Sequence, residues 1–337
     1  MKAWILEEPG KLTLQESQPT EITENLIKVK IEEVLLNNSD IEIYTGAAKR
    51  KYPFIIGRYA VGVVSVVHGD NPILRKMDRV VIEPCVPCEI CDECKSGNYT
   101  NCSNLKELGY NCNGLLCNFI DLPYSQLHTL PDQLRNEKAL FVPMVAFCLN
   151  ICDALNLEKG RHIAIFGETK QALILAQLIA YYQAVPVLIS SRVELLDMAR
   201  ELGVMYCFNP DETDVEEEIL AVTGGRKCKE LILLSNSDIN MKDVYSVVTF
   251  NANICLAGYS NKDSKLSVAQ ICRKHLNIFG VYNGAGNYSS AINLLVTDTV
   301  NIDPLIGATI SFDNLDKEMS KINPFDTGLK SKIVKIN

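Results

Sequence analysis

The chain has 337 residues and a mass of 37.5 kDa, a length that corresponds to about two domains of ordinary size. Hydrophobic residues make up 47% and charged residues 22% of it, which excludes a largely disordered chain. The net charge of −8 and the pI near 5.2 lack the basic footprint of sequence-independent nucleic-acid binding, so we expect no nucleic-acid partner.

The N-terminal segment and the hydropathy pattern show no sign of export or of membrane insertion. Residues 1–10 (MKAWILEEPG) lack a positively charged region followed by an apolar run, so we expect no signal peptide. No stretch reaches about 18 uninterrupted apolar residues, which predicts no membrane partner and a cytoplasmic protein. In that compartment the 13 cysteines favour metal binding, catalysis or simple burial over disulfides.

The first part of the chain, up to about residue 84, carries short apolar or alternating runs separated by turn residues. Examples are the runs at 26–31 (LIKVKI) and 61–67 (VGVVSVV). Such punctuation predicts the strands of a small antiparallel barrel or sandwich. A cysteine-rich segment follows, from Cys85 to Cys117.

The middle of the chain, from about 150 to 284, alternates apolar runs with helical patterns. This alternation predicts an α/β unit with a parallel, doubly wound sheet. The tail holds one helical pattern (YSSAINLLV) and ends in KIVKI, a strand that we expect to rejoin the first domain. We therefore expect a β-rich domain at 1–148, a nucleotide-binding domain at 149–284 and a return segment at 285–337. The six apolar runs are 162–166, 186–190, 206–208, 230–234, 253–258 and 275–280.

The strongest local motif is a cluster of cysteines with metal-ligand spacing. Cys88, Cys91, Cys94 and Cys102 stand as C-x2-C-x2-C-x7-C. Four thiolates on one loop can surround a tetrahedral Zn²⁺ and leave no position for water, which is typical of a structural site. Two alternatives remain open: a register that starts at Cys85 and omits Cys102, or four reduced cysteines without a metal.

The apolar run at 162–166 is followed by a degraded glycine-rich motif. Where a dinucleotide fold shows G-x-G-x-x-G, this chain reads GETKQA, from Gly167 to Ala172. Gly167 can form the tight turn and Ala172 is small enough for helix–strand packing, but Thr169 replaces the glycine that faces the pyrophosphate. The helix N-terminus still favours a phosphate group. The motif alone leaves nucleotide binding open.

The end of the second run in this unit favours a phosphorylated cofactor. An NAD site usually has Asp or Glu here to hold the ribose 2′-hydroxyl, whereas this chain has Ser190, Ser191 and Arg192. A hydroxyl and a guanidinium can bind a 2′-phosphate that a carboxylate would repel. We therefore expect NADP(H) in preference to NAD(H), with Ser191 and Arg192 as contacts. The alternative is a surface arginine that opens a helix.

With these motifs, the sequence resembles the medium-chain dehydrogenase/reductase superfamily, and within it the zinc-containing alcohol, polyol and threonine dehydrogenases. The resemblance implies a GroES-like catalytic domain, a Rossmann domain, a return segment and a homodimer or homotetramer. It also implies that Gly258 and Tyr282, after the fifth and sixth strands, approach the nicotinamide. The matching features are the MKA…PG opening, the Ser-Asp at Ser39, P-x-I-x-G at 53–57, Gly62, DRVV at Asp78, the cysteine lobe with Gly97, LPD at Leu130, the nucleotide unit and K-x-L-x-I-x-G at Lys274.

The chain departs from that family where a catalytic zinc is expected. In the family this ion is held by a Cys two residues before the Ser-Asp, by the His of a G-H-E triplet, and by a later Glu or Cys. The corresponding residues here are Asn37, Arg58 and Val142. Asn is a poor zinc ligand, Arg cannot be deprotonated and Val has no donor atom. We therefore expect a structural zinc and no catalytic zinc.

Three other residues are candidates for the chemistry. Ser39 matches the hydroxyl that relays the substrate proton in the family, and Tyr59 offers a phenolic donor or is a packing residue. Arg58 either binds a developing oxyanion or a substrate anion, or forms an internal salt bridge with Glu42 or Asp40.

Three functional hypotheses follow. The first is a zinc-independent, NADP(H)-dependent oxidoreductase that reduces a carbonyl or an activated double bond of a small substrate, with Arg58 favouring an anionic one. The second is a non-catalytic descendant that still binds a dinucleotide or another ligand, and the third is a scaffold without cofactor binding. Thr169 and the pair Asn251-Ala252, where the family usually has Gly-Gly, favour the second and third.

Overall fold

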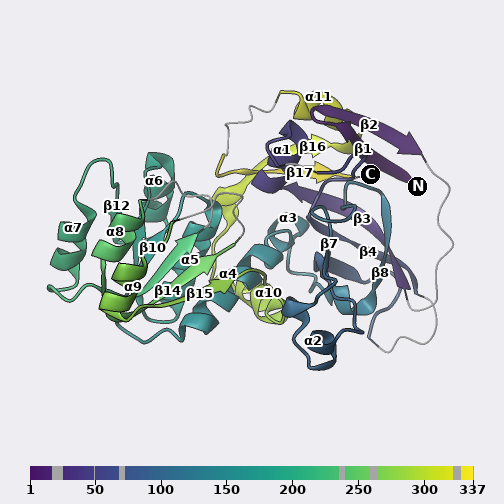
Figure 1. Ribbon diagram of the computed structural model, residues 1–337. Coiled ribbons are helices and arrows are strands. Elements are labelled where there is room, and N and C mark those ends of the chain that lie inside the picture. The colour runs from purple at the N-terminus through teal and green to yellow at the C-terminus, as the bar shows by residue number, and fades with distance from the viewer. Residues whose placement is uncertain are drawn as a thin grey trace. The chain divides into compact units, whose positions relative to one another are not determined.

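The computed structural model describes residues 1–16, 26–48, 50–67, 73–234, 240–258, 265–321 and 328–336. The chain forms two compact units (Figure 1). The first comprises Met1–Pro143 and Ile302–Asn337, and the second comprises Met144–Asn301. The return segment therefore begins at residue 302, later than the expected residue 285.

The difference in the return point has a structural reason. The segment after the last strand of the second unit is bound to other parts of that unit by side-chain hydrogen bonds. Asn150 Nδ2 donates to the carbonyl of Asn283 at 2.8 Å, and Asn287 Nδ2 donates to a carboxylate oxygen of Asp153 at 2.8 Å. Polar contacts of this kind between distant positions leave no pattern of apolar residues in the sequence.

The first unit is built on strands that pair mostly antiparallel, as its punctuated apolar runs predict. A hairpin joins β1 (Lys2–Glu8) to β2 (Lys11–Glu16). A seven-stranded sheet has the order β16-β17-β3-β4-β5-β9, and β8 also pairs with β3. The closing run KIVKI lies in β17, which pairs antiparallel with β3. The strands of this sheet are β3 (Leu26–Leu36), β4 (Tyr59–Val67), β5 (Arg79–Ile82), β8 (Phe119–Pro123), β9 (Leu127–Thr129), β16 (Ile306–Ser311) and β17 (Ser331–Lys335).

Short elements complete this unit. Two of them, β6 and β7, form a separate two-stranded ladder. The remaining elements are α1 (Asn38–Thr45), β6 (Cys85–Val86), α2 (Asp92–Lys95), β7 (Lys106–Glu107), α3 (Asn136–Ala139) and α11 (Leu315–Met319), with 3₁₀ turns at Tyr99–Asn101, Tyr124–Gln126, Asp303–Leu305 and Phe312–Asn314.

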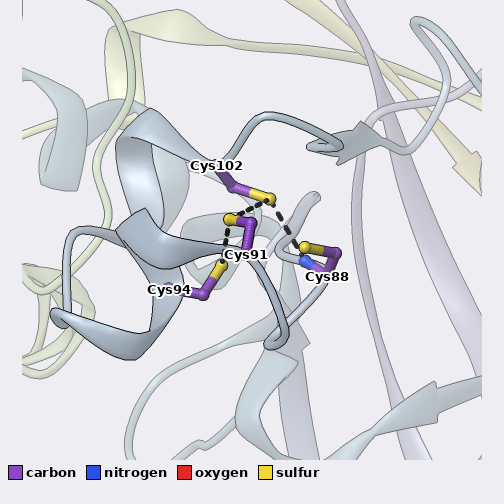
Figure 2. A group of neighbouring side chains, drawn as sticks. All are labelled: Cys88, Cys91, Cys94 and Cys102. Atoms are coloured by element: carbon purple, nitrogen blue, oxygen red, sulfur yellow. Dashed lines mark hydrogen bonds between the residues drawn. The ribbon is translucent and has the colours of Figure 1, made fainter.

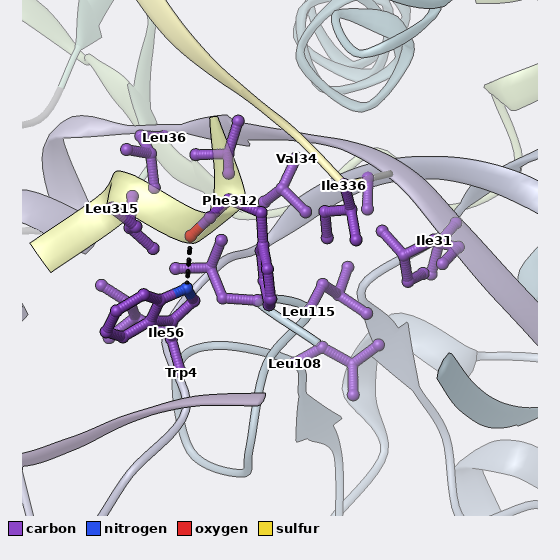
Figure 3. Close-up of a cluster of buried hydrophobic side chains, with 14 of the residues drawn as sticks. Trp4, Ile31, Val34, Leu36, Ile56, Leu108, Leu115, Phe312, Leu315 and Ile336 are labelled. Atoms are coloured by element: carbon purple, nitrogen blue, oxygen red, sulfur yellow. Dashed lines mark hydrogen bonds between the residues drawn. The ribbon is translucent and has the colours of Figure 1, made fainter. Parts of the chain in front are cut away.

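The core of the first unit joins the start of the chain to its return segment (Figure 3). The indole of Trp4 lies edge-on to Phe312, with ring centroids 6.2 Å apart, and Trp4 Nε1 donates to the Phe312 carbonyl at 2.8 Å. Pairing the buried indole N–H removes the cost of leaving it unsatisfied. Other members of this cluster are Ile31, Val34, Leu36, Ile56, Leu108, Leu115, Leu315 and Ile336.

The second unit is a six-stranded parallel sheet in the order β12-β11-β10-β13-β14-β15. This doubly wound order confirms the α/β prediction and places β10 and β13 on the two sides of the point where the winding reverses. The carboxyl ends of such strands meet at one edge, where ligands bind. The strands are β10 (His162–Phe166), β11 (Val185–Ile189), β12 (Tyr206–Phe208), β13 (Cys228–Leu234), β14 (Val248–Ala257) and β15 (Asn277–Val281).

Helices connect these strands. Helix α5 lies beside α6, and α7 lies beside α8. Among the described residues, one helical stretch, Asn136–Leu155, is apolar enough to cross a membrane by composition. Within it, 78% of the 18-residue apolar window is buried in the protein, as in a core helix. The helices are α4 (Val142–Leu155), α5 (Lys170–Tyr181), α6 (Val193–Glu201), α7 (Val215–Val222), α8 (Met241–Ser246), α9 (Val268–Lys274) and α10 (Tyr288–Val296).

Candidate functional site

Four cysteines of the lobe after β6 come together in one group (Figure 2). The sulfur atoms of Cys88, Cys91, Cys94 and Cys102 all lie within 4.8 Å of one another. The Sγ of Cys91 is 3.4 Å from that of Cys94 and 4.0 Å from that of Cys102. These residues fit a closed tetrahedral zinc site, and they are the four that the spacing predicts.

The fold of the lobe explains how the four sulfurs converge. Strands β6 and β7 pair antiparallel at its base. Cys91 is the N-cap of α2, and Gly97 has φ +80°, a left-handed turn that glycine adopts without strain. Cys85 lies outside the group, because its Sγ contacts Glu107 Oε1 at 3.9 Å. The register that starts at Cys85 is therefore not the one that the structure forms.

The thiols of the lobe differ in acidity. Hydrogen bonds from the backbone amides of Cys94 and Ser103 lower the pKa of the Cys91 thiol to about 6. Burial, together with hydrogen bonds to neighbouring thiols, raises the pKa of Cys94 to about 12. Full ionisation of the group at neutral pH therefore needs a cation, which a bound Zn²⁺ supplies.

Asn37, Val142 and Arg58, the three residues that the resemblance places at the catalytic-zinc positions, have different surroundings in the structure. The backbone N–H of Asn37 donates to a carboxylate oxygen of Asp40 at 2.8 Å, at the N-terminus of α1. Val142 is fully buried. Arg58 NH2 forms an ion pair with Glu107 Oε1 at 2.8 Å, with side-chain exposures of 16% and 6%. Arg58 stays protonated and offers no lone pair, Val142 has no donor atom, and Asn is a poor zinc ligand, so this set of side chains does not fit a zinc ion.

The ion-pair partner of Arg58 is a residue that the sequence does not single out. Glu107 lies 49 positions away, in the two-residue strand β7, whereas the expected partners were Glu42 and Asp40. The same guanidinium lies 5.6 Å from the ring of Tyr110. Arg58 is thus held as an internal salt bridge, one of the two alternatives that its sequence position allows.

Asp40 links helix α1 to the segment that carries Arg58. Its carboxylate is completely buried, and the backbone N–H of Gly57 donates to it at 2.9 Å. Burial raises the pKa of Asp40 to about 6, although the two backbone hydrogen bonds and the nearby Arg58 oppose the shift. Ser39, which precedes Asp40, and Tyr59, which begins β4, therefore come from adjoining segments.

The first unit also contains a cavity of about 360 Å³ with a cationic lining. The guanidinium of Arg50 stacks on the ring of Tyr110 at 4.0 Å, the same ring that lies near Arg58. The volume of the cavity is within the usual range for small-molecule sites. The lining residues are Arg50, Lys51, Phe54, Tyr110 and Asn111.

The glycine-rich turn follows β10 in the second unit, as its sequence predicts. A Cβ atom at Gly167 would lie 2.7 Å from Leu234 Cδ1, so a larger residue here would require the end of that leucine side chain to move. Thr169 is the N-cap of α5, and Ala172 is completely buried. Lys170, in the first turn, is also buried, and burial with the nearby Arg192 lowers its pKa to about 8.

The residues at the end of β11 are bound to that same turn. Ser190 Oγ donates to Glu168 Oε2 at 2.7 Å, and Ser191 N–H donates to Glu168 Oε1 at 2.9 Å. Arg192 NH1 donates to the Glu168 carbonyl at 3.0 Å. The sequence motif assigns no role to Glu168 or Lys170, although both lie inside it.

The last two expected cofactor contacts are neighbours. Gly258 follows β14 with φ +89°, and its N–H donates to the Val281 carbonyl at 2.9 Å. Tyr282 follows β15 and is 39% exposed. The turns after β10, β11, β14 and β15 all lie at the carboxyl edge of the sheet, so the expected cofactor contacts share one edge.

Comparisons with known proteins agree with this architecture. Residues 23–132 match the alcohol dehydrogenase GroES-like domain, and residues 172–297 match the zinc-binding dehydrogenase domain. An uncharacterised zinc-type alcohol dehydrogenase-like protein of Haemophilus influenzae is 28% identical, over 96% of this chain and 95% of its own length.

Solved structures show the same fold. The alcohol dehydrogenase RspB from E. coli CFT073, in complex with NADH, has a TM-score of 0.88 and 22% identity and covers 100% of this chain and 99% of its own. A zinc-binding dehydrogenase from Sinorhizobium meliloti 1021, bound to NADP, has a TM-score of 0.87 and 21% identity, and covers 99% of both chains. The two domain matches and this fold show that the chain is an alcohol dehydrogenase-like oxidoreductase of the medium-chain dehydrogenase/reductase superfamily.

Proposed function

We propose that the chain is a zinc-independent, NADP(H)-dependent oxidoreductase that retains only a structural zinc. It reduces a carbonyl or an activated double bond of a small substrate, with a preference for anionic ones. The observation that carries the zinc independence is the Arg58–Glu107 ion pair, which lies where the family has a metal-binding histidine. An arginine held in its cationic form by a carboxylate has no free lone pair and cannot be a zinc ligand.

The cofactor end of the proposal is supported by the carboxyl edge of the parallel sheet. Ser191 and Arg192 offer a hydroxyl and a guanidinium to a 2′-phosphate. The N-terminus of α5 and the cationic form of Lys170 favour the pyrophosphate. Relatives in fold were solved with NADH and with NADP, so both cofactors suit this architecture.

The substrate end rests on the residues of the first unit. When bound, the nicotinamide cofactor supplies the hydride. Ser39 and Tyr59 offer hydroxyl donors to a substrate oxygen, and Arg58 adds positive charge near them. Reduction of a conjugated double bond spreads charge onto a carbonyl oxygen, so hydrogen-bond donors can stabilise it without a metal ion. The cationic cavity beside Tyr110 supports an anionic substrate.

Zinc content and nucleotide binding, measured on one sample, test this proposal first. We expect one zinc per chain by elemental analysis, and tighter binding of NADPH than of NADH in a fluorescence titration. Two zincs per chain would restore metal-dependent alcohol oxidation and overturn the proposal. Binding of neither nucleotide would leave a scaffold protein.

A screen of enones and keto acids then separates an enzyme from a dinucleotide-binding protein. NADPH oxidation with any of them supports the reductase, and NADPH binding without turnover supports the non-catalytic alternative. Arg58→Met should abolish turnover and leave NADPH affinity intact if Arg58 binds substrate. Arg58→Lys is the matched control, because it keeps the positive charge. Unchanged turnover in Arg58→Met would remove Arg58 from the catalytic group.

The assembly and the compartment are further parts of the proposal. A homodimer or homotetramer is the form that the family resemblance implies, and the sequence pattern predicts a cytoplasmic compartment. Light scattering of the purified chain, together with fractionation of cells that express it, tests both. A monomer in solution or recovery in the membrane fraction would contradict this part.

A further inference from the structure

The carboxylate of Glu168 contacts the residues at the end of β11 to which the proposed function assigns the 2′-phosphate. Ser190 Oγ donates to Glu168 Oε2 at 2.7 Å. Both the N–H and the hydroxyl of Ser191 donate to Glu168 Oε1, at 2.9 and 3.3 Å. The Glu168 carboxylate, from the turn after β10, thus accepts hydrogen bonds from three donors at the end of the neighbouring strand.

Other charged side chains near this carboxylate come from the turn after β10 and from the segment after β11. Arg192 directs NH1 to the backbone carbonyl of Glu168, at 3.0 Å, and NH2 lies 3.5 Å from Glu194 Oε2. Lys170 is buried, and the nearby guanidinium of Arg192 contributes, after burial, to lowering its pKa. Glu168 contacts the serines, whereas Glu194 contacts the guanidinium and is 60% exposed.

We infer that Glu168 sets the choice between NADP(H) and NAD(H), by competing with the 2′-phosphate for Ser190 and Ser191. This inference rests on the proposed binding of a dinucleotide at this edge. A phosphate and a carboxylate cannot share the same donors, because like charges at hydrogen-bond distance repel each other. A ribose 2′-hydroxyl, in contrast, can donate to the carboxylate and accept from a serine.

The structure therefore assigns opposite effects to two neighbouring residues. Arg192 favours the phosphorylated cofactor, and Glu168 disfavours it. Most NAD sites place an acidic residue at the end of the second strand. Here that position carries serines, and the carboxylate reaches them from the glycine-rich turn. The preference for NADP(H) is consequently smaller than Ser191 and Arg192 alone would produce.

The test uses two probes that differ only in the phosphate, 2′,5′-ADP and 5′-AMP, with calorimetric titration of the full chain. Glu168→Gln keeps the size of the side chain and an acceptor oxygen but removes the charge. We expect it to raise the affinity ratio of 2′,5′-ADP to 5′-AMP by about five- to tenfold. Glu194→Gln is the matched control and should change that ratio by less than about twofold.

Three results would overturn the inference. An unchanged ratio in Glu168→Gln, with both probes still bound, would remove Glu168 from cofactor choice and leave the proposed function intact. An equal change in Glu194→Gln would assign the effect to general charge. Failure of the wild-type chain to bind either probe, NADPH or NADH would overturn the proposed function as well. If Glu168→Gln does not fold, Glu168→Ser removes the same charge and should shift the ratio in the same direction.

Discussion

Two regions of the first unit, the cysteine lobe and the Arg58–Glu107 ion pair, balance charge in opposite ways. The lobe gathers four thiols within 4.8 Å of one another, a group whose full ionisation requires a cation from outside the chain. At the other region, the positive charge belongs to Arg58 and the negative charge to Glu107, 2.8 Å away. The comparison shows that one group in this domain has no counter-charge of its own, whereas the other group has both charges on its own side chains.

Removing one zinc ligand from the lobe should have the largest effect on the free energy of unfolding. In Cys102→Ser one of four zinc ligands is lost, so we expect zinc content to fall from one to near zero per chain. The free energy of unfolding should fall by on the order of 3 kcal/mol or more, because zinc binding is coupled to folding of the lobe. Elemental analysis and urea unfolding measure the two quantities.

Cys85→Ser is the control for that experiment. Its sulfur contacts Glu107 instead of the other cysteines, so the variant should keep its zinc. Loss of zinc from Cys85→Ser, with retention in Cys102→Ser, would mean that the ligand set is wrong.

Breaking the ion pair between Arg58 and Glu107 should have the next largest effect. Arg58→Met leaves the carboxylate of Glu107 buried without its ion-pair partner, which typically costs about 3–5 kcal/mol. The double variant Arg58→Met/Glu107→Leu removes both charges and should be much less destabilised. Urea unfolding of the wild type, the single variants and the double variant measures the coupling. Additive effects of the two substitutions would contradict the pairing.

Asp40, beside Arg58, should make the stability of the first unit depend on pH between about pH 4 and 6. Burial raises its pKa from 3.8 to about 6, so between pH 4 and 6 the folded state binds more protons than the unfolded state. The contribution of Asp40 to the free energy of unfolding therefore falls as the pH rises through this window, by about 1–3 kcal/mol.

Asp40→Asn removes this titration, so its free energy of unfolding can be compared with that of the wild type at each pH. Relative to the wild type, its free energy of unfolding should rise between pH 4 and 6 and then remain level. A difference between the two proteins that stays constant from pH 4 to 7 would show that Asp40 has an ordinary pKa.

The smallest expected effect concerns the backbone of the lobe. Gly97 has φ +80°, and no atom of the described residues lies within 4 Å of the position that a Cβ would take there. Gly97→Ala therefore introduces backbone strain without a clash. We expect a loss of about 1 kcal/mol of unfolding free energy with zinc content unchanged. Gly160, which has φ +70° and similarly open surroundings, supplies the matched substitution outside the lobe.

Contacts were predictable from the sequence where the interacting residues lie close together along the chain. The four lobe cysteines lie within 15 positions, so their spacing alone reveals the group. The pairing of Arg58 with Glu107 spans 49 positions and ends in a strand of two residues, and no periodic pattern records it. The six parallel strands were predictable because each contains or adjoins a short apolar run.

The contacts between residues at the carboxyl edge of the parallel sheet were predictable only in part. Gly167, Ser191 and Arg192 stand in positions that the general pattern of such folds defines. The contact of Glu168 with the serines depends instead on how the turn after β10 reaches the end of β11, and the motif leaves that position unspecified. Burial of Lys170 likewise follows from three-dimensional packing.

The contact between Trp4 and Phe312 has a consequence for the order of events during translation. The two residues are 308 positions apart, and all of the second unit lies between them in the chain. A ribosome therefore finishes the parallel-sheet unit before it has synthesised the segment that completes the core of the first one, and domains generally fold as units during synthesis. Trp4 is the only tryptophan in the chain, so its emission reports this late closure directly.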